Sequence, residues 1–158
     1  MSARLHILAA FGLVGLMAAC SADPSMPDSQ TAATEKRIQF IANMDGRQET
    51  PPVATEANGS GTIVLDRATR RLSWDLSYNN MSSPVTGAHF HGPSGPGVAS
   101  DVQLSVAMPT GATDEVHGEA QLTDEQMREV LAGLWYVNIH TEAHPDGEIR
   151  GQVENAGM

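Results

Sequence analysis

Cysteine is almost absent from this sequence, because Cys20 is the only one among 158 residues. Without a second cysteine the chain can form no internal disulfide, so its folded part must be stabilised by packing alone. Basic residues are also scarce: the chain has 9 Lys and Arg and 19 Asp and Glu, a formal net charge of −10. This charge argues against nucleic acid or an anionic lipid surface as a partner and is compatible with cation binding.

Aromatic residues and catalytic motifs are scarce as well. The chain has two Trp, two Tyr and three Phe, too few for a surface on which ligands stack, and we expect Phe40, Trp74, Phe90 and Trp135 in the core. The sequence contains no phosphate-binding or dinucleotide-binding glycine motif, no nucleophile elbow and no interpretable pair of carboxylates. We therefore expect that the protein is not an enzyme; any activity would be copper-dependent redox chemistry.

Long hydrophobic runs are missing except near the N-terminus, where residues 8–17 are apolar and follow the basic Arg4. The run is shorter than the ~20 residues that span a bilayer, so residues 1–19 are predicted to be a secretory signal peptide. The following Ala18-Ala19-Cys20 resembles the lipobox of bacterial lipoproteins, in which the cysteine is lipidated and becomes the first mature residue. Met17 occupies the place where a lipobox usually has Leu. The alternative is an ordinary signal peptide with an unmodified Cys20.

The remaining chain is predicted to have three parts. Residues 20–36 are rich in Ser, Thr, Pro, Asp and Ala, which is typical of a flexible tether. Residues 37–154 form the folded domain, which is long enough for one hydrophobic core, and residues 155–158 are a loose tail. Ser21 stands where some lipoproteins have the Asp that retains them in the inner membrane. We therefore expect an exported protein that faces the periplasm or the cell surface, with the outer membrane favoured.

Short segments with alternating apolar and polar residues predict strands, most clearly in the series Leu72, Trp74, Leu76 and Tyr78. The predicted strands are 37–42, 61–66, 71–78, 85–91, 98–106, 114–120, 134–141 and 148–153. One short helix is predicted to begin after Thr123, which forms a capping-box pattern with the glutamine three residues later. The pattern indicates an all-β fold: an antiparallel β-sandwich of about seven or eight strands with one short helix, immunoglobulin-like or like copper-zinc superoxide dismutase.

Three histidines lie on two of the predicted strands. The period of two places His89 and His91 on one face of their strand, with Phe90 on the other, and places His140 beside Tyr136 and Asn138 on the polar face of a later strand. Three imidazoles on neighbouring strands offer a set of nitrogen ligands that suits copper or zinc. Copper-zinc superoxide dismutase also has an His-x-His strand, but this likeness is a geometric analogy only.

The same histidines have a second interpretation, a structural hydrogen-bond network with Asn138, Glu148 and Arg150. In the metal interpretation these three residues are the second shell that orients the imidazoles. Copper is expected before zinc, because the ligands are all nitrogen and the chain offers methionines as soft extra ligands. His144, in the following loop, is a candidate fourth ligand, whereas His117 is expected at the surface.

Four motifs in the second half of the chain resemble those of one known family. They are Gly87-Ala88-His89-Phe90-His91-Gly92-Pro93, Leu122-Thr123, Trp135-Tyr136-Val137-Asn138-Ile139-His140-Thr141 and Gly147-Glu148-Ile149-Arg150-Gly151-Gln152. In this order and spacing they resemble the CHRD domain, which is named after the animal protein chordin and is common as an exported bacterial domain. The resemblance implies an extracellular or periplasmic β-sandwich with no established enzymatic reaction.

These observations lead to two functional hypotheses. The first is an envelope-anchored lipoprotein that binds a transition metal, copper before zinc, through His89, His91 and His140, for storage, transfer or protection. The second is a metal-free adhesion or protein-interaction module with structural histidines, a role suggested by the domain's occurrence in chordin. A homodimer that shares a metal across a two-fold axis is compatible with the first hypothesis.

Overall fold

The computed structural model describes residues 36–109 and 114–157. The predicted signal peptide, Cys20 and all but the last residue of the predicted tether lie outside the described residues. Within the described ranges, no helix combines the length and the apolar character that a membrane crossing requires.

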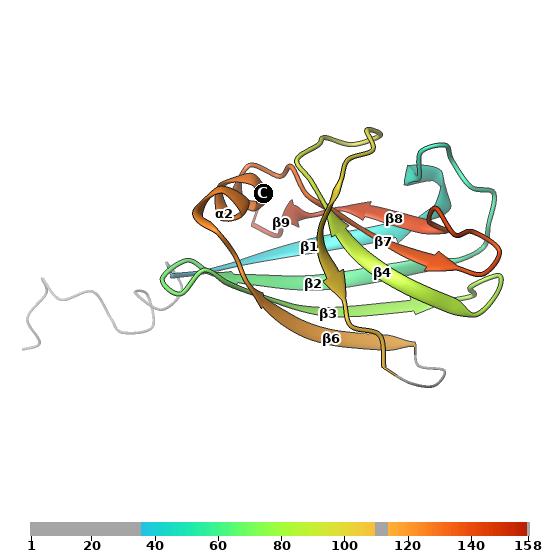
Figure 1. Ribbon diagram of the computed structural model, residues 1–158, viewed down its shortest axis with the longest axis horizontal. Coiled ribbons are helices and arrows are strands. Elements are labelled where there is room, and N and C mark those ends of the chain that lie inside the picture. The colour runs from blue at the N-terminus through green and yellow to red at the C-terminus, as the bar shows by residue number, and fades with distance from the viewer. Residues whose placement is uncertain (1–35, 110–113, 158) are drawn as a thin grey trace, which may run out of the picture.

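The described chain forms one antiparallel sheet, which confirms the all-β prediction (Figure 1). Its strands are β1 (Arg37–Asp45), β2 (Asn58–Asp66), β3 (Arg71–Asn79), β4 (Val85–His91), β5 (Val102–Val106), β6 (Glu115–Gln121), β7 (Tyr136–Thr141), β8 (Ile149–Gln152) and β9 (Glu154–Asn155). The strand order is β5-β4-β7-β8-β1-β2-β3-β6, and β9 also pairs with β1. Because β1 and β8 meet through a single residue pair, Asp45 and Arg150, the sheet turns back there and forms two layers.

The core lies between the layers and follows the alternation of the sequence. Leu72, Trp74, Leu76 and Tyr78 of β3 all point inward, as predicted. Phe90 of β4 is fully buried, and its ring centroid lies 5.1 Å from that of Trp74, so the two layers meet through these aromatic rings. The predicted core residues are therefore confirmed. Because side chains alternate along β4, the neighbours of a buried residue such as Phe90 lie on the outer face of the strand.

The predicted helix is also present, as α2 (Asp124–Leu131). Both bonds of the capping box form, since the Thr123 side chain accepts from the Gln126 backbone and the Gln126 side chain accepts from the Thr123 backbone. Val130 is fully buried against the sheet. The indole of Trp135 donates to the Glu129 carboxylate over 2.9 Å, which ties α2 to the start of β7. A short helix of this kind persists because it is capped and packed.

Several predicted boundaries differ from the observed ones. β1 continues to Asp45 and β2 already begins at Asn58, three residues beyond the predicted bound in each case. Two further differences concern Val98 and Asn155. The strand predicted over 98–106 begins only at Val102, because Val98 lies in a turn, where its carbonyl accepts from the Arg150 side chain over 2.9 Å. Asn155, predicted to begin a loose tail, instead belongs to β9 and pairs with Phe40 of β1. Both errors have one cause: long-range bonds decide the backbone conformation at these positions, and they leave no local pattern. A short 3-10 turn, η1 (Gly46–Gln48), is a further element that was not predicted.

The outer face of β4, β7 and β8 is covered by loops rather than by solvent. The segments that follow β1, β4 and β7 lie over this face, on the side of the layer away from β2 and β3 (Figure 1). Their backbone carbonyls accept hydrogen bonds from outward-pointing side chains of the strands, such as Arg150 and Gln152. Polar residues that alternation places outside the core are consequently buried: Asn138, Arg150 and Gln152 are 3 %, 2 % and 7 % exposed.

Candidate metal centre

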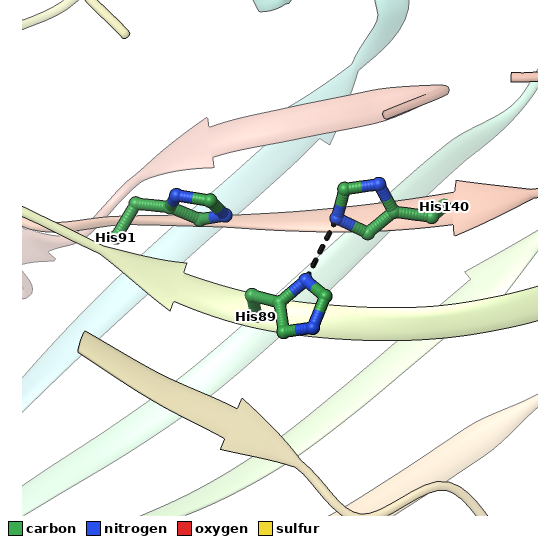
Figure 2. Close-up of side chains that lie close together, drawn as sticks. All are labelled: His89, His91 and His140. Carbon is green, nitrogen blue, oxygen red and sulfur yellow. Dashed lines mark hydrogen bonds between the residues drawn. The ribbon is translucent and has the colours of Figure 1, made fainter. Parts of the chain in front are cut away.

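The three histidines singled out in the sequence come together on this covered face. His89 and His91 extend from β4 and His140 from the adjacent β7, where Asn138 is the register partner of His89. One nitrogen from each ring can be chosen so that all three lie within 4.8 Å of one another. Figure 2 shows the rings on one side of the two strands, with the closest contact, 2.9 Å, between Nδ1 of His89 and Nε2 of His140. Within the described residues this is the one cluster of its kind.

Backbone carbonyls determine which nitrogen carries the hydrogen in two of these rings. Nδ1 of His91 lies 2.9 Å from the Ser100 oxygen, and Nδ1 of His140 lies 2.9 Å from the Pro145 oxygen. Because a carbonyl oxygen can only accept, each Nδ1 must carry the hydrogen. In the neutral rings, Nε2 of His91 and of His140 therefore carries no hydrogen, and its lone pair points toward Asn138. This is the arrangement that usually orients a metal-binding histidine.

Asn138 lies between these two lone pairs. Its Oδ1 is 3.1 Å from Nε2 of His91 and 3.0 Å from Nε2 of His140. Nε2 of His140 can accept a hydrogen from Nδ1 of His89 over 2.9 Å, but with neutral rings no hydrogen lies between Oδ1 of Asn138 and either Nε2. Three arrangements resolve this conflict: a cation at the point where the nitrogens converge, a reversed amide whose Nδ2 donates to both rings, or a proton on one of the Nε2 atoms.

Burial favours the neutral form of two of the rings. It lowers the pKa of His89, and the neighbouring imidazoles of His140 and His91 lower it further. Burial also lowers the pKa of His140, as does His91, against the opposing effects of the Pro145 carbonyl and Asp146. A neutral imidazole is the form that coordinates a metal. Both shifts favour the protonation state in which these imidazoles can act as ligands.

A buried carboxylate that the sequence did not single out, Glu49, stands behind Asn138. Burial raises its pKa, while Arg150, the Thr50 backbone and the Asn138 amide act to lower it. Gly147 makes this approach possible, because its φ is +127° and an added Cβ would lie 2.3 Å from Oε1 of Glu49. Glu49 lies in a loop with no periodic pattern, so only the tertiary structure could place it here.

Tyr136 separates the imidazoles from Arg150. The His91 ring stacks on Tyr136 with centroids 4.8 Å apart and planes 3° apart. The guanidinium carbon of Arg150 lies 3.4 Å from the centroid of the same ring. Alternation along β7 could have indicated this role, since Tyr136, Asn138 and His140 share one face. Arg150 is thus linked to His91 through an aromatic ring and makes no direct bond to a histidine.

The other candidate residues have different surroundings. Glu148 is fully buried, and its carboxylate accepts bonds from Thr55, Ser82 and Thr141 rather than from an imidazole or from Arg150. His144 follows β7 in its loop and is not a member of the three-imidazole cluster. His117 is exposed on β6, as predicted, and contacts Asp75. Met44, one of the methionines available as soft extra ligands, is 2 % exposed and packs in the core.

Comparison with known proteins gives one match. The model of the CHRD domain matches residues 40–153, a range that includes all three clustered histidines and the strands that carry them. No curated protein matches the sequence. No solved structure matches it either. Because the matched range covers well over half of the chain, this protein belongs to the CHRD domain family.

Proposed function

We propose that this protein binds one transition-metal ion through Nδ1 of His89 and Nε2 of His91 and His140. The observation that carries the proposal is the pair of bare lone pairs on His91 and His140, each locked inward by a backbone carbonyl. In metal–imidazole sites with bonds of 2.0–2.1 Å, tetrahedrally placed nitrogens lie about 3.4 Å apart. The nitrogens now lie within 4.8 Å of one another, and binding would bring them to that spacing.

Copper is the metal that we propose first, with zinc second. The cluster consists of three imidazoles without a cysteine or a carboxylate, a donor set that suits both ions. At a given nitrogen site Cu²⁺ binds more tightly than Zn²⁺. Because the three ligands leave at least one position open and the rings are only partly buried, the ion could be exchanged with another molecule. Storage, transfer or sequestration of the metal therefore fits the site better than permanent structural use.

We also propose that the protein is an exported lipoprotein of the bacterial envelope, with its lipid on Cys20. The support is the apolar segment 8–17, the lipobox-like Ala18-Ala19-Cys20 and the Ser/Pro-rich segment that follows. A lipid on Cys20 would hold the domain at a membrane surface, and Ser21 favours the outer membrane.

Replacement of Cys20 by alanine tests the anchor. In a bacterial host that processes lipoproteins, the original chain should be recovered with the membrane fraction and incorporate radiolabelled palmitate. The Cys20→Ala chain should incorporate no label and leave the membrane fraction. Substitution of the adjacent Ser21 by alanine is the matched control and should change neither result. Equal labelling of the original and Cys20→Ala chains would exclude lipidation at this position.

A second candidate function is a metal-free interaction module, and one observation favours it. With its amide reversed, Asn138 would donate to His91 and His140 and its oxygen would face Glu49. That arrangement needs a protonated Glu49, and burial does raise the pKa of this carboxyl. The histidines would then be structural, and the function would belong to the protein surface.

Metal titration distinguishes these functions. The purified chain, without a histidine tag, is titrated with Cu(I), Cu(II) and Zn(II) in competition with chelators of known affinity. We expect one tightly bound ion per chain, and loss of that binding when His89, His91 and His140 are all replaced by alanine. The matched control is His117→Ala, which removes an exposed imidazole from β6 and should leave the titration unchanged.

Thermal unfolding of the same variants gives the second readout. In a metal site, the triple-alanine chain should remain folded and lose only the stabilisation that the metal provides. In a structural network, it should unfold at a much lower temperature with or without metal, because each unsatisfied buried partner costs about 1–3 kcal/mol. Absence of any binding tighter than about 1 μM, equivalent to about 8 kcal/mol, would overturn the metal proposal.

A further inference from the structure

A hollow separate from the histidine cluster lies over β8. It lies between the segment that contains η1 and the loop between β4 and β5, and its volume is about 420 Å³. This volume falls within the range of small-ligand pockets, about 300–1,000 Å³. Pro52 and Pro96 contribute apolar walls, and the polar lining comes from Arg47, Glu49, Arg150 and Gln152. A mostly apolar lining with a few convergent polar groups is typical of a binding pocket.

The guanidinium of Arg150 is buried and has no carboxylate at ion-pair distance among the described residues, although the charge of the nearby Glu49 acts on it and opposes the lowering of its pKa by burial. Its side chain is 2 % exposed, and it donates to the Val98 carbonyl over 2.9 Å and, at 3.4 Å, to the Gly95 carbonyl and the Thr50 hydroxyl. In the described part of the chain, no carboxylate forms an ion pair with it. Buried charges in proteins are normally paired. The hollow is therefore lined by two guanidinium groups, that of Arg150 at its inner end and that of Arg47 at the rim, and by one carboxyl, that of Glu49. Arg47 also lies 3.6 Å from Asp45.

Two buried oxygens of the lining residues lack a hydrogen-bond donor. The Gln152 amide nitrogen donates to the Ser94 carbonyl over 3.0 Å and to the Gly133 carbonyl over 2.8 Å, which fixes the orientation of the amide. Its Oε1 is buried without a hydrogen-bond partner among the described residues, and so is Oε1 of Glu49. Buried polar atoms are rarely left unpaired in native proteins. A ligand in the hollow would supply a hydrogen-bond donor to Oε1 of Gln152, whereas Oε1 of Glu49 lies beside Gly147, which does not line the hollow.

We propose that this pocket binds a small carboxylate that also carries an N–H or O–H donor, an α-amino or α-hydroxy carboxylate. The carboxylate binds between the guanidinium groups of Arg150 and Arg47, whose forked N–H groups match its two oxygens. The donor group of the ligand binds Oε1 of Gln152. A phosphate dianion is disfavoured, because the carboxyl of Glu49 and the unpaired oxygen of Gln152 line the same space. This site does not depend on the metal proposal, since Tyr136 lies between Arg150 and His91.

Nuclear magnetic resonance titration of the purified, isotope-labelled chain tests the pocket. The probes are L-alanine, L-lactate, acetate and inorganic phosphate, each added without metal. L-Alanine or L-lactate should shift the amide signals of residues 47–50 and 95–98 saturably. Acetate has no donor group, so it should bind at least about 10-fold more weakly, because it leaves the pocket's acceptors unpaired. Phosphate should not compete.

The Arg47→Ala substitution gives the matched test of the contact at the rim. Arg47 is 89 % exposed in its side chain, so the variant should fold normally, and its affinity for L-alanine should fall about 5- to 10-fold with the loss of one charge-assisted contact. Arg67→Ala removes another exposed arginine, at the turn after β2, and should have no effect. Absence of saturable shifts, phosphate binding tighter than L-alanine binding, or equal loss in the Arg47 and Arg67 variants would each overturn the proposal.

Discussion

Replacing Glu148 with glutamine is expected to lower the free energy of unfolding at pH 7 by about 2–4 kcal/mol. The Glu148 carboxylate is fully buried and accepts from the hydroxyls of Thr55, Ser82 and Thr141 over 2.7–2.8 Å and from the Ser82 backbone over 3.0 Å. These donors come from three segments that are distant in sequence. Glutamine has the same shape but lacks the charge, and it places an NH₂ group against hydroxyls that now donate. Chemical denaturation of both chains measures the difference.

The effect should depend on pH with a defined sign. Burial acts to raise the pKa of Glu148, but the hydrogen bonds from Thr55, Thr141 and Ser82 outweigh it and lower the pKa below its ordinary value of 4.5. A carboxyl with a lowered pKa stabilises the fold fully above its unfolded-state pKa and loses that contribution as the pH falls through its folded-state pKa. The difference between the original and Glu148→Gln chains should therefore be constant near neutrality and shrink below about pH 4.5.

Glu154→Gln is the matched control for this prediction. Glu154 lies exposed on β9, so the same chemical change should alter the free energy of unfolding by less than about 0.5 kcal/mol. Equal stability of the Glu148→Gln and Glu154→Gln chains at pH 7 would show that the hydrogen bonds to Glu148 contribute little net energy.

Replacing His140 alone with alanine is expected to weaken metal binding by more than about 100-fold. Loss of a residue that only supports a ligand costs up to about 100-fold in metal affinity, and loss of the ligand itself should cost more. Its Nε2 is 2.9 Å from Nδ1 of His89, and its Nδ1 is held by the Pro145 carbonyl. The substitution removes one ligand of three and leaves two nitrogens on β4. Competition titration with a chelator measures the change in affinity.

His144→Ala is the control, because this imidazole lies in the loop after β7 and outside the cluster. We expect a change of less than about 2-fold, well below one tenfold step of about 1.4 kcal/mol. A large loss in the His144 variant would make His144 a fourth ligand after movement of its loop. Equal affinities of the original and His140→Ala chains would overturn the assignment of His140 as a ligand.

The fold could be predicted well wherever the pattern is local. Alternation along β3 and β4 predicted which side chains face the core, and the capping box at Thr123 predicted where α2 begins. The prediction was wrong at Val98 and Asn155, whose conformations depend on Arg150 and on β1. These partners are distant along the chain, and the local sequence pattern around a residue carries no information about them.

The sequence by itself determined that His89, His91 and His140 lie on polar faces of two strands, because the period of two is a property of the extended backbone. The pairing of β4 with β7, which brings the three imidazoles together, was decided only by the tertiary structure. So was the burial of Asn138 and Arg150 beneath loops, together with the carbonyls of Ser100 and Pro145 that fix the imidazole lone pairs. The physical reason is that strand periodicity is local, whereas pairing and loop coverage depend on packing of the whole chain.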